Sequence, residues 1–82
     1  MFIAKIYITL KKGILDPQGK AVNNALHSIG YSQVKDVRVG KYIELAVEGS
    51  DIKNIEQSVN EMCIKILTNP IIEDYTFDIM EG

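Results

Sequence analysis

The chain has 82 residues, of which 46% are hydrophobic, a formal net charge of −2 and a single cysteine. This size and composition predict one folded domain over residues 1–82, with a core small enough to favour self-association. The acidic balance argues against a general nucleic-acid binder or a protein of acidic membrane surfaces, and the lone cysteine excludes an internal disulfide. No apolar run is long enough to span a membrane and no signal-peptide pattern is present, so we expect a cytoplasmic protein.

The first half of the chain predicts a strand and then a helix. Residues 2–10 alternate with period two, which is typical of a half-buried strand. The side expected to face the core carries Phe2, Ala4, Ile6, Ile8 and Leu10. After a loop in which Gly13 turns the chain, Asp16 is a good N-cap, Pro17 suits the first helical position and Gly30 ends the helix. The apolar stripe of this helix comprises Val22, Ala25, Leu26 and Ile29.

The segment from residue 37 to residue 47 is interpreted as two strands around Gly40. An even turn at Gly40 would place a glutamate opposite a core valine. An odd turn or a bulge would instead pair Val39 with Ile43 and Val37 with Leu45, and we favour this pairing, with Gly40 supplying an unusual backbone angle.

A second helix and a last strand complete the chain. The helix is expected to start at Ser50 or Asp51 and to stop before Pro70. Its stripe is Ile52, Ile55, Val59, Met62, Cys63, Ile66 and Leu67. The last strand, residues 72–80, turns Tyr75, Phe77 and Ile79 to one side. The order β-α-β-β-α-β predicts an α+β, ferredoxin-like two-layer sandwich, with a four-stranded antiparallel sheet and two helices on one face.

The residues show no catalytic constellation, so we expect no catalytic, cofactor-binding or metal site on this chain. A phosphate-binding P-loop needs four residues between its glycines and a hydroxyl after its lysine. Five residues separate Gly13 from Gly19 here, and Ala21 follows Lys20. His27, the only histidine, falls on the polar side of its helix, and Cys63 falls on a core stripe. The acidic residues Glu73, Asp74 and Asp78 are split between two strand faces.

One face of the predicted sheet is incompletely polar. With both helices on the other face, this outer face carries Ile3, Tyr7, Ala46 and Met80. These residues form a candidate self-association face, because exposed apolar side chains that gather in one place favour a partner. RNA binding through the sheet would need more exposed aromatic residues with basic flanks.

Three segments, "KKGILDPQGKAVNNALHSIGY", "VKDVRVGKYIEL" and "ILTNPIIEDYTFDI", carry a family resemblance. In this order they resemble the PurS subunit family of phosphoribosylformylglycinamidine (FGAM) synthase, and the likeness spans nearly the whole chain. The resemblance implies a small non-catalytic subunit of a purine-biosynthesis ligase, which is a homodimer or tetramer. It bridges a glutaminase subunit (PurQ type) and a synthetase subunit (PurL type), supports ammonia transfer, and leaves ATP and Mg to the synthetase.

The resemblance also reinterprets the first loop as a preorganised contact surface, since a restricted loop loses less entropy on docking. The candidate partner interface therefore comprises Lys12, Asp16, Gln18 and Lys20, with Asn69, Glu73 and Tyr75 as a second patch. The alternative is a dimeric regulatory domain of βαββαβ type that senses a small ligand. That alternative predicts saturable binding of an amino acid or a nucleotide by the isolated chain.

Overall fold

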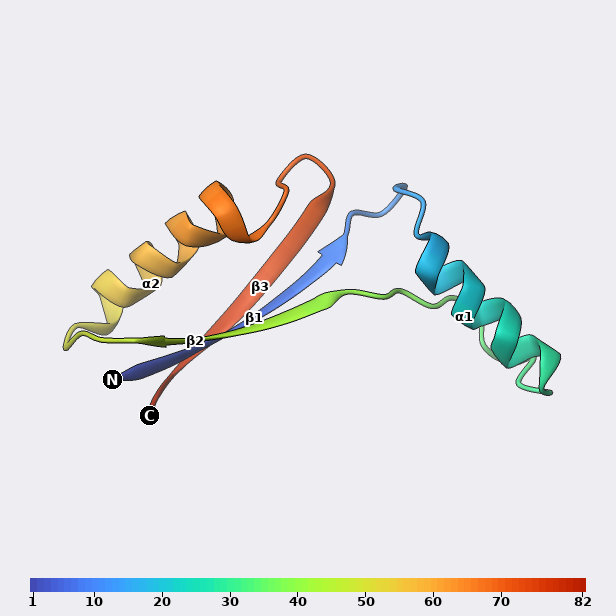
Figure 1. Cartoon of the computed structure of the whole chain (residues 1–82), viewed down its shortest axis with the longest axis horizontal. Helices are drawn as coiled ribbons and strands as arrows, with labels where there is room; N and C mark the ends of the chain where they lie inside the picture. Colours follow the sequence, from blue (N-terminus) through green and yellow to red (C-terminus); the bar gives the residue numbers. More distant parts are fainter.

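The computed structural model describes all 82 residues and contains one antiparallel sheet and two helices (Figure 1). The strands are β1 (Phe2–Leu10), β2 (Lys41–Val47) and β3 (Glu73–Glu81), and the helices are α1 (Pro17–Ser28) and α2 (Ile52–Met62). A π-helical turn, η1 (Cys63–Leu67), extends α2. None of these helices combines the length and the hydropathy that are needed to cross a membrane.

The sheet has three strands in the order β2-β1-β3, so β1 is its centre. Ile6 lies opposite Ile43 on one side and Phe77 on the other. The alternation predicted for residues 2–10 is confirmed, because Phe2, Ala4, Ile6 and Ile8 are buried while the residues between them are more exposed. The last strand is also confirmed, with bounds shifted by one residue.

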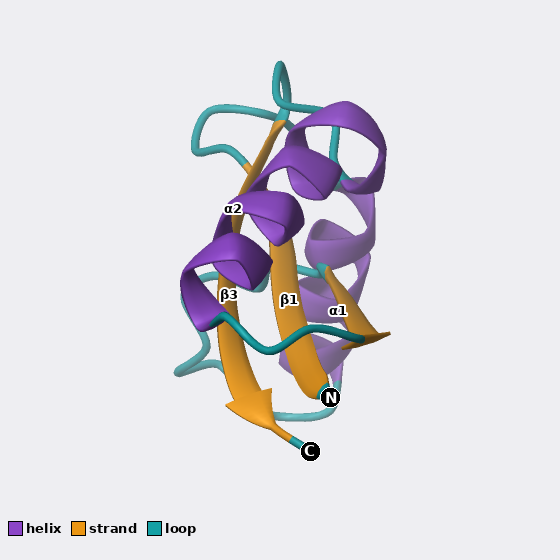
Figure 2. Cartoon of the chain, turned by 90° about the vertical axis from the view of Figure 1, so that its left-hand side faces the viewer, coloured by secondary structure: helices purple, strands orange, loops and turns teal.

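Helix α2 covers the inner face of the sheet (Figure 2). Asp51 caps it, as expected, through a bond from the Lys53 amide to its carboxylate. Of its predicted stripe, Ile55, Val59 and Cys63 lie in the core with the buried residues of β1, whereas Ile52 and Ile66 near its ends are 43% and 79% exposed. The helix ends in η1, where the Thr68 amide donates to the carbonyl oxygen of Cys63 at 3.0 Å, and Pro70 follows.

Helix α1 lies beyond the end of the sheet and covers neither of its faces (Figure 1). Its predicted start at Pro17 with Asp16 as N-cap is confirmed, and Gly30, at φ +105°, follows its C-terminus as expected. Its apolar stripe, however, is not buried: Val22 is 43% exposed and Ile29 is 71% exposed. The expectation of two helices on one face of the sheet is therefore not met within this chain.

The expected fourth strand is absent from the sheet, and the hairpin around Gly40 is a wrong prediction. Ile43 and Leu45 pair with Ile6 and Ala4 of β1, not with Val39 and Val37. Residues 37–39 do not form a strand of this sheet because α1 is about 18 Å long and leads away from the sheet, so the chain must cover that length again to return. Residues 31–40 are used to run back along it, so they reach the sheet as a connection (Figure 1). Gly40 does not adopt a positive φ.

The resulting molecule is elongated. Its principal extents are 50 × 27 × 14 Å and its radius of gyration is 16.2 Å. A compact chain of this length would have a radius of gyration of about 12 Å. Only nine residues are buried, so a single copy encloses a small core.

Candidate partner interface

Three segments meet where α1 leaves the sheet, and we call this meeting point the α1 joint: residues 8–10, 16–19 and 37–40. Asp16 lies at its centre. One carboxylate oxygen accepts from the Gly19 amide and the other accepts from the Val39 amide, both at 2.9 Å. These two amide donors, with Arg38 as a weaker contributor, hold the pKa of Asp16 below its ordinary value. Asp16 thus joins the start of α1 to a segment 23 residues away.

Two glycines let the main chains of the joint approach closely. A Cβ atom on Gly19 would lie 2.1 Å from the carbonyl oxygen of Val37, and one on Gly40 would lie 2.2 Å from that of Ile8. Real side chains do not tolerate such distances from a backbone atom. The α1 joint is therefore made largely of backbone, which requires glycine at both positions.

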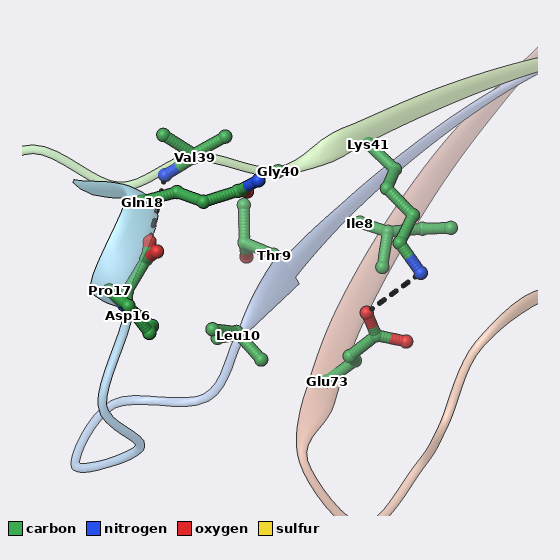
Figure 3. A pocket seen from close by; sticks show the side chains of 10 residues that line it. All are labelled: Ile8, Thr9, Leu10, Asp16, Pro17, Gln18, Val39, Gly40, Lys41 and Glu73. Carbon is green, nitrogen blue, oxygen red and sulfur yellow. Dashed lines mark hydrogen bonds and ion pairs between the residues drawn. The ribbon is translucent and has the colours of Figure 1, made fainter. Parts of the chain in front are cut away.

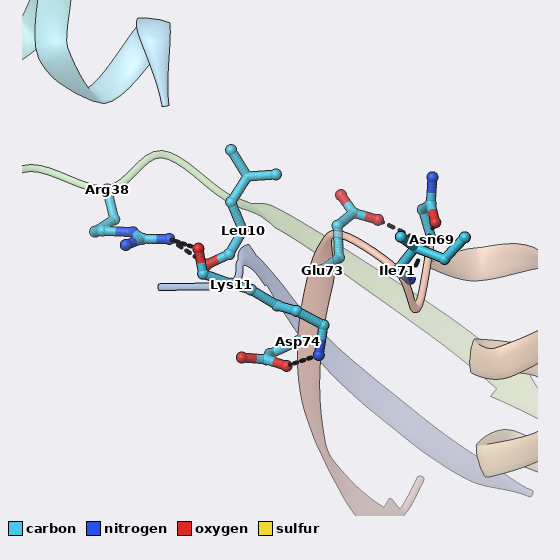
Figure 4. Close-up of polar contacts among 7 residues, drawn as sticks. All are labelled: Leu10, Lys11, Arg38, Asn69, Ile71, Glu73 and Asp74. Carbon is cyan, nitrogen blue, oxygen red and sulfur yellow. Dashed lines mark hydrogen bonds and ion pairs between the residues drawn. The ribbon is translucent and has the colours of Figure 1, made fainter. Parts of the chain in front are cut away.

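Arg38 makes the third connection of the joint (Figure 4). Its Nη2 donates to the carbonyl oxygen of Leu10 and, at 3.1 Å, to that of Lys11. Pairing between β1 and β2 ends at Ile8 and Lys41. The guanidinium therefore supplies donors to main-chain carbonyls beyond the point where the neighbouring strand stops. Sequence reasoning placed Arg38 in a strand and missed this role.

A half-open cleft of about 320 Å³ lies beside the joint (Figure 3). It is lined by Ile8, Thr9, Leu10, Asp16, Pro17, Gln18, Val39, Gly40, Lys41 and Glu73. Residues from both candidate partner patches, Asp16 and Gln18 from the first and Glu73 from the second, thus meet at one cleft. Sequence reasoning treated these patches as separate.

Glu73, the acidic residue of the second patch, is held by two contacts. Its carboxylate accepts from the Asn69 amide at 2.8 Å and lies 3.3 Å from the Lys41 ammonium (Figures 3 and 4). The Asn69 amide, and to a lesser extent Lys41, lowers the pKa of Glu73. Next to it, the Lys11 ammonium lies 2.8 Å from the Asp74 carboxylate. This network ties the turn before β3 to the ends of β1 and β2.

The other members of the two predicted patches are more dispersed. Lys12, Gln18 and Lys20 are exposed and their side chains make no hydrogen bond or ion pair, so they are free to meet a partner. Asn69 uses its side chain to accept from the Ile71 amide. Tyr75 lies on the inner face of the sheet, and its hydroxyl donates to Asn60 of α2 at 2.5 Å. Tyr75 is thus engaged within the fold.

The candidate self-association face is assembled by the strand register. Ile3 lies opposite Ala46 on one side and Met80 on the other, so these three residues form a row across the sheet. Tyr7 forms a second row with Tyr42, the two ring centroids being 5.3 Å apart. Lys5 lies between these rows, opposite Glu44 and Asp78. The face therefore presents an apolar row, a charged row and an aromatic row.

The Tyr42 hydroxyl donates to the Glu44 carboxylate at 2.8 Å. This hydrogen bond, with a smaller effect of burial and of the Glu44 charge, raises the pKa of Tyr42 to about 12. The hydroxyl is therefore a donor throughout the physiological pH range.

Residues with reactive side chains do not converge. Cys63 is fully buried, and burial raises the pKa of its thiol, which makes it a core residue as expected. His27 is exposed on α1, with Nε2 2.7 Å from the carbonyl oxygen of Val34. No group of three or more histidine, cysteine, aspartate or glutamate side chains is arranged to hold a metal ion.

Comparisons with known proteins identify relatives of the whole chain. The family model described as PurS, phosphoribosylformylglycinamidine (FGAM) synthase, matches residues 3–81. The Bacillus subtilis protein named phosphoribosylformylglycinamidine synthase subunit PurS is 51% identical over 81 residues, which are 99% of this chain and 95% of that protein.

Solved structures agree with these sequence relatives. A crystal form of B. subtilis PurS matches with a TM-score of 0.88, over 99% of this chain and 100% of that one. Methanocaldococcus jannaschii PurS gives a TM-score of 0.89 at 36% identity, over 100% and 99% of the two chains. A chain of the Thermotoga maritima PurLQS structure gives 0.85 at 25% identity, over 98% and 99%.

Proposed function

The chain belongs to the PurS family of phosphoribosylformylglycinamidine (FGAM) synthase and is a subunit of that purine-biosynthesis ligase, and we propose that it acts there as a non-catalytic bridge. The bridge joins a PurQ-type glutaminase to a PurL-type synthetase in the cytoplasm. The similar chain in the T. maritima structure named PurLQS supports a role within such an assembly.

In this proposal the chemistry belongs to the partners. The glutaminase releases ammonia from glutamine, and the synthetase uses ATP and Mg to activate the amide oxygen of formylglycinamide ribonucleotide. The small subunit holds the two in register and supports the transfer of ammonia. The scatter of His27, Cys63 and the acidic residues is compatible with this division of labour.

The observation that carries the proposal is the uncovered surface of α1. Two helices of this chain have apolar stripes, but only α2 places part of its stripe in the core: Val59 of α2 is 0% exposed, whereas Val22 and Ile29 of the α1 stripe are 43% and 71% exposed. A compact protein of 9.2 kDa exposes about 4900 Å², while this chain exposes 5939 Å². The surplus of about 1000 Å² is near the ~800 Å² that each partner contributes to a standard interface.

We further propose that copies of the chain associate, as a homodimer or tetramer, through the stripe of α1 and the outer face of the sheet. A second copy would complete the covering that a ferredoxin-like sandwich needs and that one chain lacks. Burying the row of Ile3, Ala46 and Met80 would add apolar contact, although the charges of Lys5, Glu44 and Asp78 must then be paired.

Sedimentation measures this association. We expect the native chain to be at least a dimer at micromolar concentration, and Ile29→Glu and Met80→Glu each to lower the average mass. Asn24→Glu is the matched control, because it adds the same charge to α1 on the side opposite the stripe. A native chain of monomer mass at high micromolar concentration would contradict the proposal.

Reconstituted FGAM synthase tests the bridging role. Gln18→Ala combined with Lys20→Ala should weaken assembly with the glutaminase and the synthetase, because both side chains are exposed and unengaged. Exposed substitutions of this kind change stability by about 0.5 kcal/mol or less, so the melting temperature should not fall. Asp16→Ala is the control whose melting temperature should fall. Full glutamine-dependent activity of the double variant at limiting concentration would show that this loop is only a connection.

The regulatory alternative is not favoured, since the relatives are named as synthase subunits. We expect calorimetry to find no binding of ATP or glutamine by the purified chain. Micromolar binding of ATP by the chain alone would overturn the assignment of ATP to the synthetase.

A further inference from the structure

The direction of α1 is set at one place. The helix lies off both faces of the sheet, so packing against the sheet does not orient it (Figure 1). Its two connections to the sheet are the loop of residues 11–16 and the segment of residues 29–40, and both pass through the α1 joint. Within one chain, the contacts of the α1 joint are therefore the ones that can restrict the direction of α1.

Hydrogen bonds divide the joint into two parts. Asp16 fastens the first turn of α1 to Val39, which holds the helix to the returning segment. With that bond alone, α1 and the segment of residues 29–40 that returns to the sheet could still move together relative to the sheet. Arg38 supplies the other part, because its guanidinium holds the returning segment to the carbonyl oxygens of Leu10 and Lys11 at the end of β1.

We propose that Arg38 is a positioning residue that fixes the direction in which α1 leaves the sheet. One nitrogen of the planar guanidinium, Nη2, donates to two successive carbonyl oxygens at once, and two bonds resist rotation better than a single bond does. A lysine ammonium has enough N–H donors for both carbonyl oxygens but lacks the planar group that fixes their direction, and glutamine would present a shorter, uncharged amide. The close contact of Gly40 with Ile8 then acts as the pivot about which the segment would turn if Arg38 were lost.

The likeness to B. subtilis PurS supports a defined direction. A TM-score of 0.88 over 99% of this chain requires the matched helix to lie in nearly the same place relative to the sheet. Within its own chain, a helix that stands off its sheet is held by its connections, in addition to any second copy that covers its stripe.

Spin-label distances measure the direction of α1 in the full chain carrying Ile29→Glu, in which the proposed contact of the stripe with a second copy is broken and only the chain's own connections hold the helix. Labels at Asn24→Cys on α1 and Lys53→Cys on α2 report the distance between the two helices, and dilution with unlabelled chain isolates distances within one copy. Both side chains are exposed and make no hydrogen bond. Cys63 is buried and should take up no label. Labelling of the chain without added cysteines is the control for this.

We expect one narrow distance population with Arg38, a population at least about twofold wider with Arg38→Gln, and an intermediate width with Arg38→Lys. Lys35→Gln is the matched control on the same segment, since the Lys35 side chain makes no contact with hydrogen-bonding groups, and it should leave the width unchanged. An Arg38→Gln population as narrow as the native one would overturn the proposal. Loss of the sheet's circular dichroism in both Arg38 variants would also overturn it, since Arg38 would then be required for folding itself.

The consequence for assembly rests on the proposed function and has its own readout. If the freed helix spends about a tenth of its time in the competent direction, about tenfold more subunit is needed for half-maximal FGAM formation. The maximal rate should not change, because Arg38 touches no reacting group. A wide distance distribution with unchanged half-saturation would keep Arg38 as a positioning residue and count against the use of α1 in assembly.

Discussion

Gly19→Ala tests the backbone contact in the α1 joint, because two effects of opposite sign compete there. Alanine in a helix is favoured over glycine by about 0.5–1 kcal/mol. At this position, however, the new methyl group would lie 2.1 Å from the carbonyl oxygen of Val37, whereas ordinary contacts begin at 3.4 Å. The shortfall of about 1.3 Å must be absorbed by the main chain of residues 37–39 or by α1.

A shift of that size would also lengthen the 2.9 Å bond from the Val39 amide to Asp16 beyond hydrogen-bonding distance. Forcing extra volume into a packed site costs about 1–3 kcal/mol, which exceeds the gain in helix propensity. We therefore expect Gly19→Ala to lower the free energy of unfolding by about 1–2 kcal/mol. For a chain of this size that corresponds to a fall in melting temperature of roughly 4–15 °C.

Urea and thermal unfolding at one fixed chain concentration measure the effect, since association makes the melting temperature depend on concentration. Asn24→Ala is the matched control: it lies in the same helix, is exposed, and should gain only helix propensity, about 0.5 kcal/mol. If Gly19→Ala were stabilised as much as the control, the close approach of α1 to Val37 would not exist in solution.

Three further results are expected. One of the four tyrosines, Tyr42, should ionise near pH 12 in an ultraviolet titration, and Glu44→Gln should return it toward 10, whereas an unchanged titration would contradict the hydrogen bond. Amide donors lower the pKa of Asp16 in the folded chain, so the Asp16 carboxylate stabilises the fold above its unfolded pKa, and this stabilisation is lost as the pH falls. The melting temperature should therefore fall below about pH 4, and it should fall less in Asp16→Asn. Cys63 should resist a thiol reagent until the chain unfolds, and rapid native labelling would contradict its burial.

Local structure followed from local sequence in most of this chain. Period-two alternation identified β1 and β3, and Asp16, Pro17 and Asp51 marked the starts of both helices. These signals work because strand pleating and helix capping depend on residues a few positions apart. The three family segments also identified the synthase to which the chain belongs, because their amino-acid motifs, in this order, are specific to that family.

The tertiary structure decided which apolar surfaces are covered within one chain. The stripes of α1 and α2 look alike in sequence, yet the middle of the α2 stripe is buried in the core and the α1 stripe is not. A hydrophobic pattern indicates that a helix face packs against other apolar residues, but it does not indicate whether those residues belong to the same chain.

The same limit explains the hairpin and the role of Arg38. Val37 and Val39 have strand-forming side chains, but the length and direction of α1 leave them as its return path. Ile43 and Leu45 then pair with β1, and Arg38 donates to carbonyls 27 and 28 residues away. No local rule links residues at that separation. The sequence by itself determined every element except the expected strand before Gly40, and only the path of the chain in space determined which elements pair.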